Sequence, residues 1–87
     1  MGRFRVVWSR QAAGSLATIW SDAVNRQSIA DAANAVDREL SYDPALRGKA
    51  LAEGLRVLET PPLRIIFEVS DADHTARIVG VRALSQR

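Results

Sequence analysis

Residues 63–69 carry the strongest folding constraint in the sequence, because their apolar side chains alternate with other residues. Apolar residues occupy every second position of this segment: Leu63, Ile65, Phe67 and Val69. The positions between them are Arg64, Ile66 and Glu68. Successive side chains of a β-strand point to opposite faces, so this pattern predicts a strand with one buried face. The chain therefore needs a sheet and a second layer that covers it.

Two predicted helices supply the second layer. Ser9 is the expected N-cap of a first helix that ends near residues 22–25. Its apolar stripe contains Ala13, Leu16, Ala17 and Trp20. A second helix stops before Asp43-Pro44, because a residue that precedes proline disfavours helical dihedral angles. Its apolar face is Ile29, Ala32, Ala33, Val36 and Leu40. A short polar link predicts an antiparallel hairpin of the two helices.

The remaining segments complete an α+β fold in a single domain over residues 1–87. Residues 4–8 are a predicted strand before the first helix, and the tryptophans Trp8 and Trp20 are expected in the core. Residues 43–54 contain Pro44, Gly48 and Gly54 and are predicted to be a loop. Strands are expected at 55–59, 63–69 and 75–83. The order is therefore strand, helix, helix, strand, strand, strand, with the helical hairpin on one face of the sheet.

The pairing of the last two strands places two arginines side by side. The favoured register makes two pairs on the core face, Ile65 with Val81 and Phe67 with Val79. That face is then apolar as far as Arg77, and Arg64 lies directly across from Arg82 on the other face, with Cβ atoms about 5 Å apart. A register shifted by one residue would bury the charge of Arg82. Two guanidinium groups on one face can bind a phosphate group.

Composition excludes several kinds of chemistry. The chain has no cysteine, which excludes disulfides, thiolate zinc sites and cysteine catalysis. A Ser-His-Asp triad would have to use His74, the single histidine. The sequence has no Gly-rich phosphate loop or metal-ligand cluster, so no cofactor or metal is expected. Its longest apolar runs are three residues, and its start lacks a signal peptide, so we expect a cytoplasmic protein with no membrane partner.

Arginine supplies most of the positive charge. Eleven of the twelve basic residues are Arg, and Lys49 is the single Lys. Guanidinium groups suit bidentate contact with phosphate, which favours a nucleic-acid partner; a general codon bias toward arginine is the alternative. Basic residues outnumber acidic ones only in the second half of the chain. There Arg47 and Lys49 flank Gly48, either as contacts to a nucleic-acid backbone or as part of a solvated loop.

The order of elements and several stretches resemble the RelE/ParE superfamily of toxins from type II toxin–antitoxin modules. The matching stretches extend over nearly the whole chain, at residues 4–9, 16–20, 29–33, 43–44 and 61–69. The resemblance implies an N-terminal strand, an antiparallel two-helix hairpin and then a three-stranded antiparallel sheet, in the order β-α-α-β-β-β.

The resemblance also implies growth inhibition and an antitoxin partner that wraps over the toxin. RelE-like members cleave mRNA on the ribosome, whereas ParE-like members block DNA gyrase and need no hydrolytic site. The chain is thus expected to be a toxin, with a ribosome-dependent, metal-independent endoribonuclease as the favoured activity. A non-enzymatic gyrase inhibitor and a degenerate member that retains only antitoxin binding are the alternatives.

Candidate site residues follow from the resemblance. Arg64 matches the arginine of the family's "Arg-apolar-apolar-aromatic" phrase, and Arg82 matches a basic position near the end of the last strand. Arg47 and Lys49 lie where ribonuclease members place basic residues, and all four cations are candidate RNA contacts. Catalysis is assigned to Arg64, Arg82 and Glu68, the last as a base. Alternatively, Arg64 forms a salt bridge with Glu68 or Glu59. Residues 79–87 contain neither the Tyr nor the His that many ribonuclease members carry there.

Overall fold

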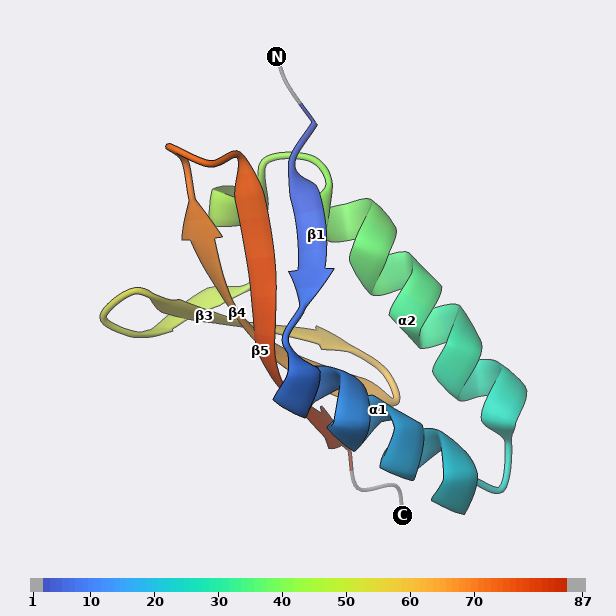
Figure 1. Cartoon of the computed structure of the whole chain (residues 1–87). Coiled ribbons are helices and arrows are strands. Elements are labelled where there is room, and N and C mark those ends of the chain that lie inside the picture. The colour runs from blue at the N-terminus through green and yellow to red at the C-terminus, as the bar shows by residue number, and fades with distance from the viewer. Residues whose placement is uncertain (1–2, 85–87) are drawn as a thin grey trace.

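The computed structural model describes residues 3–84 and confirms the predicted α+β architecture (Figure 1). In order, its elements are β1 (Arg5–Trp8), α1 (Arg10–Asp22), α2 (Arg26–Leu40), a 3-10 helix (Pro44–Leu46), β2 (Lys49–Ala52), β3 (Leu55–Thr60), β4 (Leu63–Ser70) and β5 (Thr75–Ala83). The strands form one sheet in the order β1-β5-β4-β3-β2. β1 is parallel to β5, and the other neighbours are antiparallel.

Side chains just before each helix explain where the helices begin. The Ser9 hydroxyl accepts a hydrogen bond from the backbone N–H of Ala12 at 3.0 Å, which confirms the predicted cap of α1. The Asn25 side chain does the same for the N–H of Ser28, at 3.1 Å. α2 ends at Leu40, before the Asp43-Pro44 pair, as the sequence predicted.

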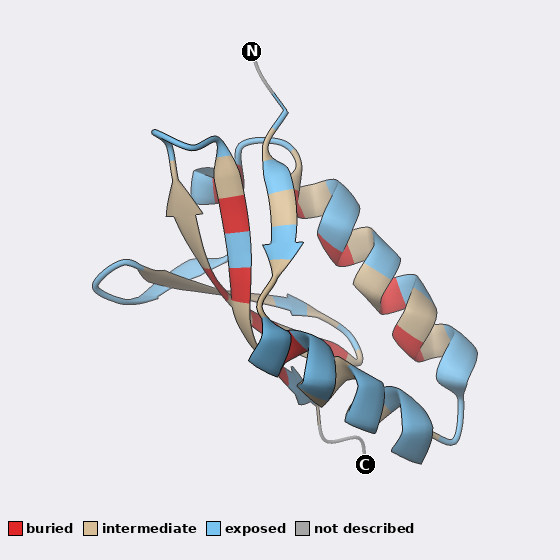
Figure 2. Cartoon of the chain, in the orientation of Figure 1, coloured by how far each residue is buried: buried red, intermediate tan, exposed pale blue. Residues whose placement is uncertain are grey.

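The core lies between the helical hairpin and one face of the sheet (Figure 2). Most of the predicted apolar positions of α2 and β4 are buried in it, whereas Ala33 and Val69 are half-buried and pack against it. Its buried members are Ala12, Ile29, Ala32, Val36, Leu40, Leu63, Ile65, Phe67, Ala76, Ile78 and Val81. Trp8 packs against this core, and its indole N–H donates to Oδ1 of Asp37 at 2.9 Å. That hydrogen bond ties β1 to α2.

The prediction that Trp20 belongs to the core is wrong. Its side chain is 43% exposed, and the guanidinium carbon of Arg26 lies 4.6 Å from its ring centroid. The tip of the helical hairpin extends away from the strands (Figure 1), so no sheet covers the end of α1. A helical stripe predicts which side of a helix is apolar, but the length of the sheet decides how much of that stripe is buried.

The predicted loop at residues 43–54 is also partly wrong, because it contains the 3-10 helix and the edge strand β2. β2 pairs with β3 through Lys49 opposite Val57. Gly48, with φ of +63°, lies against the backbone of Val57 as the chain enters β2. The Arg56 guanidinium donates to the carbonyl oxygen of Arg47 at 2.9 Å and holds this segment in place. Residues 49–52 read Lys-Ala-Leu-Ala, which has little intrinsic strand preference.

The predicted register of β4 and β5 is correct at one end and wrong at the other. The confirmed pairs are Ile65 with Val81 and Arg64 with Arg82. Beyond a shift between Ile66 and Phe67, Phe67 pairs with Ile78 instead of Val79. An extra residue in one strand reverses its alternation, so Ile78 and Val81 are both buried. Arg77 consequently lies on the exposed face, with Nη1 3.7 Å from Oε1 of Glu68.

We predict that Gly48→Ala lowers the free energy of unfolding by about 1–3 kcal/mol, the cost of holding a non-glycine residue in a strained backbone conformation. A Cβ at this position would overlap the carbonyl oxygen of Val57. The control is Gly14→Ala in α1, where a Cβ meets no atom within 4 Å and should add about 0.5–1 kcal/mol of stability. Denaturant unfolding of both variants checks this, and equal midpoints would contradict it.

Candidate anion-binding site

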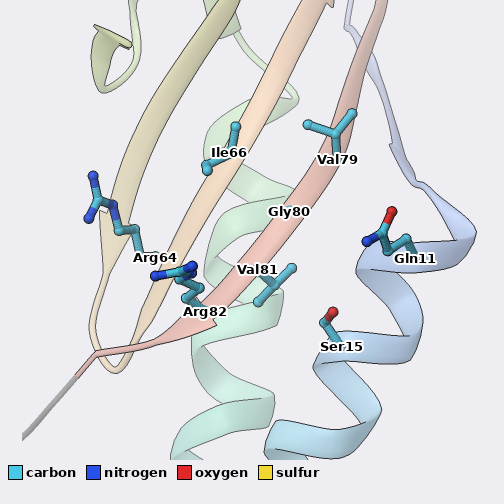
Figure 3. Close-up of a pocket in the computed structure, with 8 residues that line it drawn as sticks. All are labelled: Gln11, Ser15, Arg64, Ile66, Val79, Gly80, Val81 and Arg82. Carbon is cyan, nitrogen blue, oxygen red and sulfur yellow. The ribbon is translucent and has the colours of Figure 1, made fainter.

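Arg64 and Arg82 line one end of a pocket on the sheet face that points away from the core (Figure 3). They are direct cross-strand partners, and both guanidinium groups lie on the same side of the β4–β5 ribbon (Figure 3). The pocket has a volume of about 340 Å³. We call it the arginine pocket, and its lining residues are Gln11, Ser15, Arg64, Ile66, Val79, Gly80, Val81 and Arg82.

One nitrogen of the Arg64 guanidinium is buried on this face of the sheet. This atom, Nε, has no hydrogen-bond partner among residues 3–84. A buried polar group without a partner costs free energy, and like charges directly opposite each other on adjacent strands are destabilising. A bound anion would relieve both penalties, since it accepts hydrogen bonds and neutralises charge. The geometry therefore defines a candidate anion-binding site.

Lys49 lies beside this pocket. It shares a second cavity of about 340 Å³ with Arg64, and the other residues that line this cavity are Gly48, Val57 and Glu59. Arg64 thus lies between the second cavity and the arginine pocket, which also contains Arg82. Within residues 3–84, the structure records no ion pair of Arg64 with Glu59 or Glu68. The alternative prediction of a salt bridge to Arg64 is therefore not borne out in the described part of the chain.

Glu68 and Arg47 are placed apart from the arginine pocket. Glu68 pairs with Arg77 and lines a different cavity of about 600 Å³ near the β4–β5 turn. It is four positions along β4 from Arg64, a span of about 13 Å. Arg47 is half-buried, and its Nε donates to the carbonyl oxygen of Tyr42 at 3.2 Å. A catalytic role for Glu68 and an RNA contact by Arg47 stay predictions that this placement does not support.

None of the described residues that line the arginine pocket is a carboxylate, histidine or tyrosine. His74 lies at the β4–β5 turn with φ of +52°, and its ring stacks on Phe4 with centroids 4.7 Å apart. Of the C-terminal stretch that lacks Tyr and His, residues 85–87 lie outside the described part of the chain. The pocket thus offers charge stabilisation without an evident proton-transfer group.

Gln11 and Ser15 are pocket residues that the sequence interpretation missed. They are four positions apart on α1 and therefore lie on the same side of that helix. Their spacing was the available signal, but polar residues four apart are common on exposed helix surfaces. Only the packing of α1 beside β5 shows that they line the arginine pocket.

Residues 3–84 contain no group of three or more His, Cys, Asp or Glu side chains suited to hold a metal ion. In the same part of the chain, no helix has both the length and the apolar character that crossing a membrane requires.

Comparisons with known proteins show the fold. No protein-family model matches the chain. No curated protein matches it either. Among solved structures, the RelBE2 toxin–antitoxin complex from Mycobacterium tuberculosis is similar with a TM-score of 0.81 and 19% identity, over 99% of this chain and 97% of that one. The chromosomal ParDE toxin–antitoxin system from P. aeruginosa gives 0.77 and 17%, over 95% and 98%.

The isolated RelE toxin from E. coli is also similar, with a TM-score of 0.57 and 10% identity over 97% of this chain and 87% of that one. The likeness to structures of both RelE and ParE systems confirms the fold that the resemblance implied. The chain has the RelE/ParE toxin fold.

We predict that Arg64→Ala leaves the free energy of unfolding unchanged or raises it by about 0.2–1 kcal/mol, because the repulsion from Arg82 is removed. Inorganic phosphate should raise the melting temperature of the wild type, since it binds the folded state, but not that of Arg64→Ala. Arg77→Ala is the matched control, because Arg77 lies in an exposed ion pair outside the pocket. Thermal unfolding at constant ionic strength checks this. A full phosphate shift in Arg64→Ala would contradict it.

Proposed function

We propose that this chain is the growth-inhibiting toxin of a type II toxin–antitoxin module and that it cleaves mRNA on the ribosome. The observation that carries this proposal is the pair of Arg64 and Arg82 on the open face of a RelE/ParE fold. The Nε of Arg64 is buried and has no hydrogen-bond partner in the described part of the chain. Guanidinium groups bind phosphate bidentately, and each nucleotide of an mRNA carries one phosphate.

The proposed chemistry needs no metal. The 2′-oxygen of a ribose attacks the adjacent phosphorus, the P–O5′ bond breaks, and the products are a 2′,3′-cyclic phosphate and a 5′-hydroxyl. Solvent would take up the 2′-hydroxyl proton and supply one to the leaving 5′-oxygen. Negative charge builds on the phosphorus-bound oxygens during attack, and fixed cations stabilise that charge. Guanidinium groups remain protonated, so Arg64 and Arg82 would stabilise the transition state without transferring protons. Among residues 3–84, the pocket lacks a side chain for proton transfer. Dependence on the ribosome fits a pocket without such a side chain, because the ribosome would orient the 2′-hydroxyl for attack.

A non-enzymatic toxin that captures DNA gyrase is the second candidate. It is favoured by the same absence of an acid or base among the described pocket residues, together with the likeness to a ParDE system. A protein that acts by binding needs only a complementary surface.

Induction of the chain alone in a bacterium should arrest growth and produce new RNA 5′ ends at fixed positions within codons. Arg64→Ala should abolish the arrest at equal expression, whereas Arg77→Ala should retain it. Mapping of RNA ends and of cleaved DNA from the same cultures checks this. Cleaved DNA without RNA cuts would replace the nuclease proposal with the gyrase proposal. Absence of arrest would indicate a degenerate member that keeps only antitoxin binding.

The proposed antitoxin partner would cover the helical hairpin with a helix and the sheet with an extended arm. α1 and α2 enclose an open groove of about 440 Å³. We call it the helix groove, and its lining residues are Ala13, Leu16, Ala17, Trp20, Ile29, Ala30, Ala33 and Asn34. An apolar groove between helices suits the apolar face of an amphipathic helix. The exposed indole of Trp20 would be buried by such a partner.

Ala17→Arg should keep the chain toxic but prevent rescue by its antitoxin. Ala17 is exposed in α1, and arginine is a good helix former, so the fold should be preserved. A long charged side chain in the helix groove would exclude an apolar helix. Asp22→Arg, at an exposed position outside the groove, is the control that should still be rescued. Co-expression with the product of the neighbouring antitoxin gene checks this, and rescue of Ala17→Arg would contradict it.

A further inference from the structure

We propose that the arginine pocket holds one whole nucleotide of the RNA, base included, and that Gln11 and Ser15 select the base. This inference rests on the proposed function, because it takes RNA as the ligand of the pocket. It assigns a base-binding part to the pocket in addition to the phosphate-binding arginines.

The floor of the pocket is apolar and is flattened by a glycine. Ile66 and Gly80 are cross-strand partners at the middle of the exposed face, next to Val79. A Cβ at Gly80 would lie 3.6 Å from Cβ of Ile66, so it would project on the same face as the Ile66 side chain. Because Gly80 has no side chain, the surface beside Ile66 stays open. A nucleobase has a flat apolar face that can lie on such a surface.

The size of the pocket restricts the ligand. Its volume of about 340 Å³ lies near the lower limit of small-molecule sites, which span about 300–1,000 Å³. That space suits one nucleotide and excludes a folded RNA element. Recognition at this site would therefore act on a single unstacked base, the form in which RNA sequence is usually read by proteins.

One wall of the pocket can hydrogen-bond to the edge of a base. Gln11 and Ser15 project from successive turns of α1 toward β5 (Figure 3). A glutamine amide presents a donor and an acceptor together, and a hydroxyl group does both. Gln11 is exposed and Ser15 is half-buried, so both can reach a ligand. With the phosphate on Arg64 and Arg82, a base lying over Gly80 would extend from the arginines toward this wall.

Two substitutions separate base recognition from phosphate binding. Gln11→Ala removes the amide from an exposed position, so the fold should be unaffected. Gly80→Val fills the floor with a side chain whose Cβ is in ordinary van der Waals contact with Ile66. Neither substitution removes an arginine, so both variants should still bind inorganic phosphate. Arg64→Ala should lose the binding of both phosphate and nucleotides.

The test is a titration of the purified chain with each of the four nucleoside 3′-monophosphates and with inorganic phosphate. Binding is monitored through the NMR chemical shifts of the backbone amides. The wild type should bind one nucleotide at least about tenfold more tightly than another, a difference of ~1.4 kcal/mol. Gln11→Ala should lose this discrimination. Gly80→Val should lower the affinity for each of the four nucleotides about tenfold. Thermal unfolding of each variant confirms that it is folded.

Equal affinities of the wild type for the four nucleotides, or an unchanged ranking in Gln11→Ala, would overturn the base-binding assignment. Nucleotides that bind no better than phosphate would overturn it as well. RNA ends mapped in growing cells test the proposed function separately. If RNA is cut but the purified chain binds the four nucleotides equally, the ribonuclease proposal is kept and only the base-binding assignment is rejected.

Discussion

Burial of one face of β4 against the helical hairpin is the constraint on which the structure depends. Leu63, Ile65 and Phe67 are all fully buried, and each apolar residue removed from water contributes about 1.5–3 kcal/mol. Alternation along the strand then forces Arg64 to the opposite face. The arginine pocket is thus a geometric consequence of the core, because the residue between two buried neighbours has no other direction available.

The pairing of Arg64 with Arg82 destabilises the folded state. Burial of the opposite face of the sheet offsets this cost. Two like charges face each other, and one guanidinium nitrogen is buried without a partner among residues 3–84. Polar groups left unsatisfied in this way tend to mark sites where a ligand completes the hydrogen bonding. The pairs of apolar residues on the core side hold the two arginines in register.

α1 contributes to two surfaces of different character. Its side chains Gln11 and Ser15 line the arginine pocket, whereas Leu16, Ala17 and Trp20 line the helix groove. The pocket is polar at its rim and basic, and the groove is mostly apolar. One rigid helix therefore fixes the relative position of a candidate RNA site and a candidate antitoxin site, because both are built from residues within three turns of the same element.

The local sequence was enough to determine the two helices, the Ser9 cap of α1, the strand β4 and the pairing of Arg64 with Arg82. Each of these follows from the spacing of apolar residues within a short segment or from the high cost of burying a charge. Tertiary contacts decided the rest. β2 exists because Lys49 and its neighbours meet β3, the bulge in β5 turns Arg77 outward to Glu68, and the end of the sheet leaves Trp20 exposed. Such features depend on which distant segments meet, and spacing along the chain does not contain that information.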